Sequence, residues 1–193
     1  MKGKRSLCPL CLAGVLVAAT AIAAAEDLAE LVKRVRPSVV LITCYDDAGN
    51  AACTGSGFFL NKEGHIVTNR HVVERAARIE AKLSDSQVFP LTHIQAEDVQ
   101  ADLVLLSGEI PAKDIRPISV AKTVPEPGEH VAIIGNPLGL EQSVSDGVVS
   151  AVREVPNAAK YIQTTAPISP GSSGSPHPKT PLDMKGAVGV YLT

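Results

Sequence analysis

The chain has 193 residues, of which 45% are hydrophobic and 20% are charged, and its formal net charge is −2. This length suits one domain of ordinary size. The weakly acidic balance excludes attraction to nucleic acid or to an anionic membrane surface through overall positive charge.

The first 25 residues have the pattern of a secretory signal peptide. A basic start at Lys2, Lys4 and Arg5 precedes an apolar run from Leu7 to Ala25 that ends in three alanines. The run is long enough for a retained membrane anchor, but the small-residue ending is typical of a signal peptidase site. We therefore expect cleavage after Ala25 and export to the periplasm or the extracellular space. The mature chain then has 168 residues and a net charge of −5.

A short helix is predicted next, from Glu26 to Arg36. Its apolar residues recur at helical spacing, and Pro37 ends it. These apolar residues are Leu28, Leu31, Val32 and Val35.

The rest of the chain consists of short apolar runs separated by Gly, Pro, Asn and Asp, a pattern that predicts a β-barrel or a β-sandwich. The predicted strands are Val39–Thr43, Gly57–Leu60, His65–Thr68, Arg78–Leu83, Leu103–Leu106, His130–Ile134, Ser143–Val152 and Ala187–Tyr191. The run Val131–Ile134 is apolar on both faces, as expected of a strand deep in a packed barrel. The turn signal Pro125–Gly128 marks a passage between two halves.

Two cysteines, Cys44 and Cys53, remain after signal cleavage. An even pair in an exported chain predicts a disulfide, here across a hairpin whose turn is residues 45–50. Two free thiols are the alternative. A pair of cysteines is too few for a zinc site, which usually takes four ligands.

Three segments each supply one chemically important residue type, in the order histidine, aspartate, serine. His71 follows a strand in Thr68–Val73, Asp102 opens the apolar strand Leu103–Leu106, and Ser173 lies in the Gly-rich turn Gly171–Pro176. Each residue alone also has an ordinary structural interpretation, as a buried histidine, a turn aspartate or a flexible loop serine. Their combination is what points to catalysis.

The chemistry requires these three residue types. A serine hydroxyl becomes an effective nucleophile when a base removes its proton, and histidine is such a base near neutral pH. A buried aspartate fixes the tautomer of the histidine and stabilises the imidazolium that forms. Glycines let the backbone N–H groups of Gly171 and Ser173 point at one spot, where they would hold the oxyanion of a tetrahedral intermediate.

Taken together, these segments resemble the HtrA (Deg) family of trypsin-like serine proteases. Further segments carry the same resemblance: Val35–Val40, Gly55–Phe58, Ile134–Leu140 with Val144–Val152, and Ile162–Gly171. The likeness extends from about Leu28 to Thr193, which is nearly all of the mature chain.

The resemblance implies an all-β, chymotrypsin-like double β-barrel with a short N-terminal helix, in a domain of residues 26–193. The first barrel is expected at about residues 37–122 and the second at about 129–193. It also implies an endopeptidase that cuts unfolded or damaged proteins, with no metal or organic cofactor. Ile168 matches a position that lines the S1 pocket, where an aliphatic side chain favours small apolar P1 residues, and plain core packing is its alternative role.

The sequence departs from the family pattern in the turn around Ser173 and near its end. Ser172 replaces the usual Asn and Ser175 the usual Gly, and the loop 177–181 contains two prolines. After Gly189–Tyr191 we expect the last strand or strands of the second barrel, and any PDZ domain, to be missing. Either the chain is a truncated or degenerate member of the family, or a partner completes the barrel; a homo-oligomer is a further alternative. Two hypotheses follow: an active exported serine endopeptidase, or a truncated, catalytically impaired module that binds unfolded polypeptide.

Overall fold

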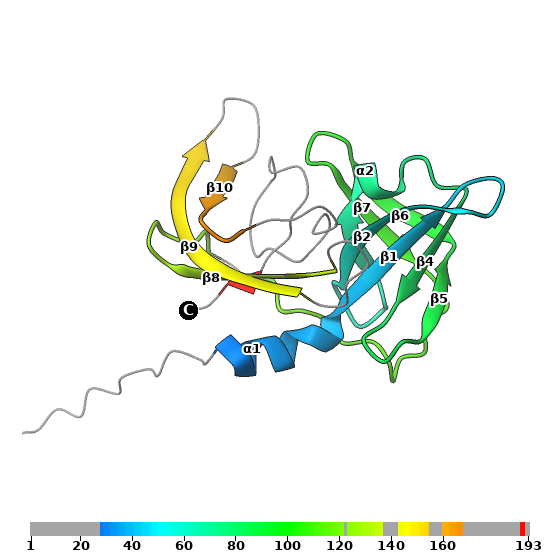
Figure 1. Cartoon of the computed structure of the whole chain (residues 1–193), viewed down its shortest axis with the longest axis horizontal. Helices are drawn as coiled ribbons and strands as arrows, with labels where there is room; N and C mark the ends of the chain where they lie inside the picture. Colours follow the sequence, from blue (N-terminus) through cyan, green and yellow to red (C-terminus); the bar gives the residue numbers. More distant parts are fainter. Residues whose placement is uncertain (1–27, 122, 137–142, 155–159, 168–189, 192–193) are drawn as a thin grey trace, which may run out of the picture.

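The computed structural model describes residues 28–121, 123–136, 143–154, 160–167 and 190–191, which form two antiparallel sheets and short helices (Figure 1). The N-terminal elements are α1 (Leu28–Val35), the 3-10 turn η1 (Arg36–Ser38), β1 (Val39–Tyr45), β2 (Ala51–Phe59), β3 (Ile66–Asn69) and α2 (Arg70–Val73). The following elements are β4 (Arg78–Lys82), β5 (Val88–Leu91), β6 (His93–Asp98), β7 (Leu103–Ser107), β8 (His130–Gly135), β9 (Ser143–Glu154), β10 (Lys160–Thr164) and β11 (Val190–Tyr191). Among the described residues, no helix combines the length and the apolar character that a membrane span requires.

The first sheet has seven strands in the order β5-β4-β1-β2-β3-β7-β6 and curls round on itself. Its two end strands, β5 and β6, are separated in the chain by Thr92 alone, whose N–H donates to the Ser107 carbonyl at the end of β7 (2.9 Å). Gly108 lies at this closure, where a Cβ atom would come within 2.1 Å of the Pro90 carbonyl oxygen. Only a glycine allows the two backbones to approach so closely.

The inside of this sheet is filled by large apolar side chains. Alternate residues of β7 are buried, as the two-residue period of a strand requires, so Val104 and Leu106 face the core. They pack with Phe59, Ile66 and Ile42, all of which are fully buried. The first sheet thus has a hydrophobic core of its own.

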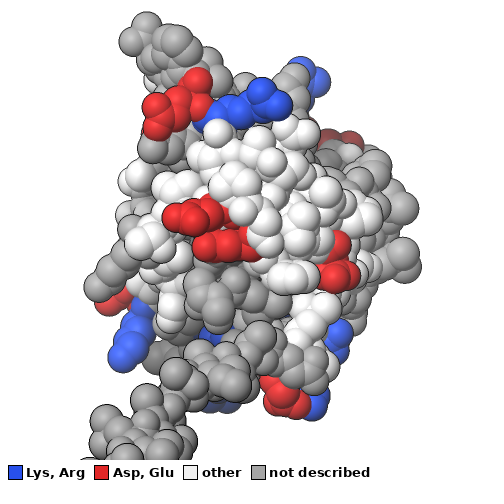
Figure 2. Space-filling model, turned by 90° about the vertical axis from the view of Figure 1, so that its left-hand side faces the viewer, with Lys and Arg blue, Asp and Glu red and all other residues white. Residues whose placement is uncertain are grey.

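The second sheet has the order β10-β9-β8-β11, and its central strand β8 is buried on both faces. Val131 and Ile133 pack with residues of β9 and β10, while Ala132 and Ile134 pack on the opposite side. This confirms the prediction of a doubly buried strand. On the face of the molecule at the side of β8 and β9, acidic and basic side chains of the described residues form small separate groups between larger uncharged areas (Figure 2).

Helix α1 joins the two sheets. Leu31 and Val35 are buried against Val39 at the start of β1 and against Ala132 and Ile134 of β8. The α-helix ends at Val35, close to the predicted limit, and Pro37 then lies in the 3-10 turn η1. The proline is tolerated there because it occupies the first turn of that helix, where its missing N–H is not needed.

Most of the predicted strands are present, and the fold class predicted from sequence, an all-β fold of chymotrypsin-like type, is confirmed. Three strands and one helix were not predicted: β5, β6, β10 and α2. Strand β5 contains Pro90, and every residue of β6 is exposed, so neither has the apolar alternation that identifies a half-buried strand.

Candidate active site

Strand pairing in the first sheet brings His71 and Asp102 together. Strands β3 and β7 are antiparallel neighbours, and Asn69 at the end of β3 is paired with Leu103 at the start of β7. Helix α2 begins directly after Asn69, and Asp102 directly precedes Leu103. Residues that are 31 positions apart in the chain therefore meet at one end of the sheet.

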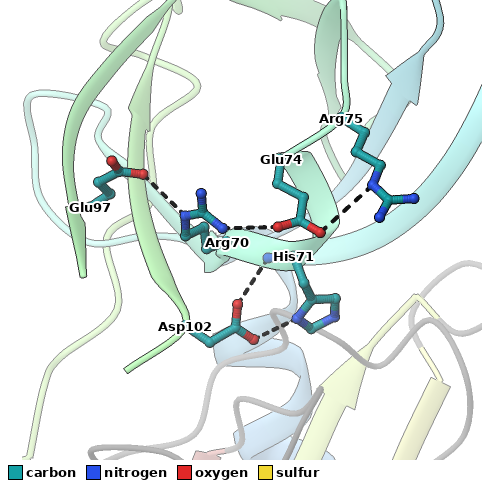
Figure 3. A network of polar contacts seen from close by, with 6 residues as sticks. All are labelled: Arg70, His71, Glu74, Arg75, Glu97 and Asp102. Atoms are coloured by element: carbon teal, nitrogen blue, oxygen red, sulfur yellow. Dashed lines mark hydrogen bonds and ion pairs between the residues drawn. The ribbon is translucent and has the colours of Figure 1, made fainter. Parts of the chain in front are cut away.

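The side chains of His71 and Asp102 make a two-point contact (Figure 3). The Nδ1 atom of His71 lies 2.5 Å from Oδ2 of Asp102, and the backbone N–H of His71 donates to Oδ1 of the same carboxylate at 2.9 Å. An ionised carboxylate only accepts hydrogen bonds, so the proton of a neutral imidazole is placed on Nδ1. The Nε2 atom, which points away from Asp102 in Figure 3, then has its lone pair free to act as a base.

The other predicted site residues, Gly171, Ser173 and Ile168, lie outside the described residues. So does the predicted signal peptide with its cleavage site after Ala25. The structure therefore shows that the predicted His71 and Asp102 are in contact, and their catalytic roles, the nucleophile, the oxyanion donors and the S1 residue stay predictions.

A network of ion pairs surrounds the outer side of α2. Arg70 pairs with Glu74, the C-cap residue of α2 (2.9 Å), and with Glu97 of β6 (3.2 Å), and Arg75 lies 4.0 Å from Glu74 (Figure 3). The Arg70 side chain is 32% exposed, so each pair contributes about 1 kcal/mol or less. Sequence reasoning missed the link from Arg70 to Glu97 because it depends on the position of β6.

Ser56, in the segment Gly55–Phe58 that resembles the family, joins the two sheets. It is fully buried, and its hydroxyl accepts a hydrogen bond from the backbone N–H of Asn136 just after β8 (2.8 Å). Its carbonyl accepts from the Thr68 hydroxyl on β3 (2.7 Å). The next residue, Gly57, leaves no room for a side chain, since a Cβ atom would lie 2.9 Å from the Ile66 side chain. The stretch thus fixes the second sheet beside the strand that leads to His71.

Cys44 and Cys53 are direct partners in the pairing of β1 with β2, as the predicted disulfide requires. In the structure both are free thiols, so the bridge is not formed there. The two S–H groups donate instead to the carbonyl of Val72, the residue after His71, at 3.1 and 3.0 Å. Burial, together with a hydrogen bond to Cys53, raises the pKa of the Cys44 thiol from 9.0 to about 12.

The described residues contain no group of three or more His, Cys, Asp or Glu side chains close enough to hold a metal ion.

Comparison with known families supplies the context of this pair. A model of the trypsin-like peptidase domain matches residues 55–177, a range that includes His71, Asp102 and Ser173. The chain belongs to the trypsin-like peptidase family. The match covers most of the domain predicted at residues 26–193.

Relatives of this peptidase domain confirm the predicted resemblance to HtrA and DegP proteins. This chain is 38% identical over 131 residues to "Protease Do-like 1, chloroplastic" of Arabidopsis thaliana, and the match covers 64% of this chain and 30% of the relative. It is 40% identical over 130 residues to a "Probable periplasmic serine endoprotease DegP-like" of Hahella chejuensis, covering 65% of this chain and 27% of the relative. The chain thus matches about 30% of the length of these relatives.

The fold matches a solved peptidase. The crystal structure of the serine endoprotease from Yersinia pestis superposes with a TM-score of 0.67 at 26% identity, over 86% of this chain and 61% of that chain.

Proposed function

We propose that this peptidase domain is an exported serine endopeptidase that hydrolyses peptide bonds of unfolded or damaged proteins. The observation that carries the proposal is the 2.5 Å contact between His71 Nδ1 and Asp102 Oδ2, in a chain of the trypsin-like peptidase family. The names of the relatives, which include periplasmic serine endoproteases, support both the reaction and the export.

In the proposed mechanism, Ser173 Oγ attacks the carbonyl carbon of the scissile peptide bond while His71 Nε2 takes the hydroxyl proton. Asp102 stabilises the imidazolium that results. The oxyanion of the tetrahedral intermediate is held by the backbone N–H groups of Gly171 and Ser173. His71 then gives the proton to the leaving amine, and water hydrolyses the acyl-enzyme by the same steps in reverse order.

Substrate selection is the finer part of the proposal. Ile168 lines the S1 pocket and favours small apolar P1 residues, and an unfolded substrate supplies the extended backbone that an endopeptidase cleft accepts. Mapping the cleavage sites in an unfolded protein by mass spectrometry tests this preference, and frequent cleavage after charged residues would contradict it.

The direct test of the proposed function is digestion of casein by the purified chain. We expect Ser173→Ala to abolish digestion, while Ser172→Ala, a matched loss of one hydroxyl in the same turn, retains it. Equal digestion by the wild type and Ser173→Ala would refute the assignment of the nucleophile. No digestion by the folded wild type would refute the function itself.

A further inference from the structure

Asn69 occupies the junction between β3 and α2, immediately before the Arg70–His71 pair. It is the N-cap residue of α2 and is fully buried. An asparagine at an N-cap normally accepts a hydrogen bond from one of the next backbone N–H groups through its side-chain oxygen. Asn69 makes no such capping bond, and its side chain instead contacts Asp102.

Asp102 instead accepts the hydrogen bonds of the backbone N–H groups at the beginning of α2. Its backbone carbonyl accepts from the N–H of Arg70 at 2.9 Å, and its carboxylate accepts from the N–H of His71 at 2.9 Å. These are the first two N–H groups of the helix, which have no partner within the helix itself. The helix that carries His71 is therefore held at its start by both the backbone and the side chain of Asp102.

The Asn69 carboxamide is directed at the same aspartate. Its Nδ2 donates to the Asp102 carbonyl at 3.0 Å, so that this carbonyl has two donors, Asn69 and Arg70. Asp102 has φ of 52°, in the left-handed region that residues with a side chain rarely adopt. A conformation of this kind persists where neighbouring groups determine it from several sides.

The turn between β6 and β7, which leads into Asp102, is also held by hydrogen bonds. The carboxylate of Asp98 accepts a hydrogen bond from the N–H of Ala101 at 2.9 Å, and Asp98 is paired with Leu103 across the turn. The turn between β6 and β7 is thereby held before Asp102, and the Asn69 and Arg70 donors hold the peptide after it.

We propose that Asn69 is a positioning residue for the His71–Asp102 pair. Its buried carboxamide fixes the carbonyl of Asp102, and with it the left-handed backbone from which the carboxylate reaches both His71 N and His71 Nδ1. Asn69 does not touch the reacting atoms and acts through Asp102. The kinetic part of this inference rests on the proposed peptidase function, whereas the geometric part concerns the unliganded protein.

The test compares Asn69→Leu with Asn61→Leu. Leucine has nearly the shape of asparagine but no donor. Asn61 is a matched control, because its side chain accepts from the backbone N–H of His65 (3.1 Å) and contacts His65 Nδ1 (2.8 Å), in the turn before β3. Both variants lose side-chain hydrogen bonds of an asparagine, but only one loses the bond to Asp102.

The first readout is the NMR resonance of the His71 Nδ1 proton in protein labelled with 15N-histidine, assigned by its loss in His71→Ala. We expect a downfield resonance in the wild type and in Asn61→Leu, and its displacement or loss in folded Asn69→Leu. In casein digestion, Asn69→Leu should lower kcat by roughly 10²-fold with KM little changed, as for a misplaced catalytic group.

An unchanged resonance and unchanged kcat in Asn69→Leu would overturn the inference. If Asn69→Leu does not fold, the hydrogen bond from Asn69 to Asp102 is tested in the wild type by the exchange rate of the Asn69 side-chain amide protons. Slow exchange of one Nδ2 proton supports the bond to Asp102, and rapid exchange of both rejects it. If the wild type digests no casein, the proposed function fails, and the NMR measurements still decide the role of Asn69.

Discussion

The seven-stranded sheet and the four-stranded sheet bury their apolar side chains in different ways. The first sheet curls around large side chains such as Phe59, Ile66 and Leu106. The described part of the second sheet buries smaller ones, including Val149 and Ala166. Among the described residues, the other face of its inner strand β8 packs against α1 and Val39 of β1.

This difference bears on the site. His71 and Asp102 lie next to strands of the first sheet, where backbone pairing of β3 with β7 sets their separation. Their geometry therefore depends on a core that is complete within one sheet. Four predictions test this contrast, from the largest expected effect to the smallest.

Asp102→Asn should lower activity strongly while leaving the stability of the first sheet nearly unchanged. The Asn oxygen can still accept from the His71 backbone N–H, so the free energy of unfolding should change little. With the oxygen in that place, the amide NH2 group faces His71 Nδ1 and donates to it, which favours the tautomer protonated on Nε2 and should lower kcat by about 10⁴-fold. Casein kinetics and urea unfolding measure the two effects. A free energy of unfolding lowered by as much as the fall in kcat implies would show that Asp102 is needed for folding as well as for the site.

Phe59→Ala tests whether the first sheet depends on its large core side chains. Phe59 is fully buried, and its removal should lower the free energy of unfolding by about 3–5 kcal/mol. The counterpart in the second sheet is Ile162→Val, for which we expect about 0.5–1.5 kcal/mol. Urea denaturation at one temperature compares them. A loss in Phe59→Ala no larger than that in Ile162→Val would contradict the dependence of the first sheet on Phe59.

Oxidation of Cys44 and Cys53 should stabilise the first sheet selectively. The two residues are direct partners across β1 and β2, so a bridge would close a short loop and contribute about 2–3 kcal/mol. Unfolding of the chain before and after treatment with oxidised glutathione measures the effect, with Cys53→Ser as the control. No bridged species by mass spectrometry, after exposure to the oxidant, would count against the predicted disulfide.

Arg70→Gln should have the smallest effect. Its ion pairs with Glu74 and Glu97 lie at the surface, so the free energy of unfolding should fall by about 1 kcal/mol or less, and less still at high salt. The backbone N–H of Arg70, which donates to Asp102, is retained in the variant. A large loss of activity would show that the ion pairs, rather than the hydrogen bonds to Asp102, hold α2 in place.

Some of this architecture could be read from the sequence and some could not. His71 and Asp102 were identified because short motifs place them beside strand-like runs, and β8 because its apolar run has no polar face. Strand β6 carries no such signal, because its position depends on pairing with β7 while all its side chains are exposed. An alternating pattern in the sequence indicates a strand only where one face is buried, and no residue of β6 is buried.

The role inferred for Asn69 shows a second limit. Just after a predicted strand, an asparagine two positions before a histidine is an ordinary polar residue, and its neighbours in sequence indicate at most a helix cap. The contact that distinguishes it is with Asp102, 33 positions away in the chain. Only the register of β3 against β7 brings that carbonyl within reach.

The central claim is that the His71–Asp102 pair activates the hydroxyl of Ser173. Mass spectrometry of the chain after reaction with an organophosphonate tests it most directly. We predict one phosphonyl group on Ser173 in the wild type and almost none in His71→Ala. Labelling on Ser172 or Ser175, equal labelling of both proteins, or no adduct on the folded wild type would contradict it.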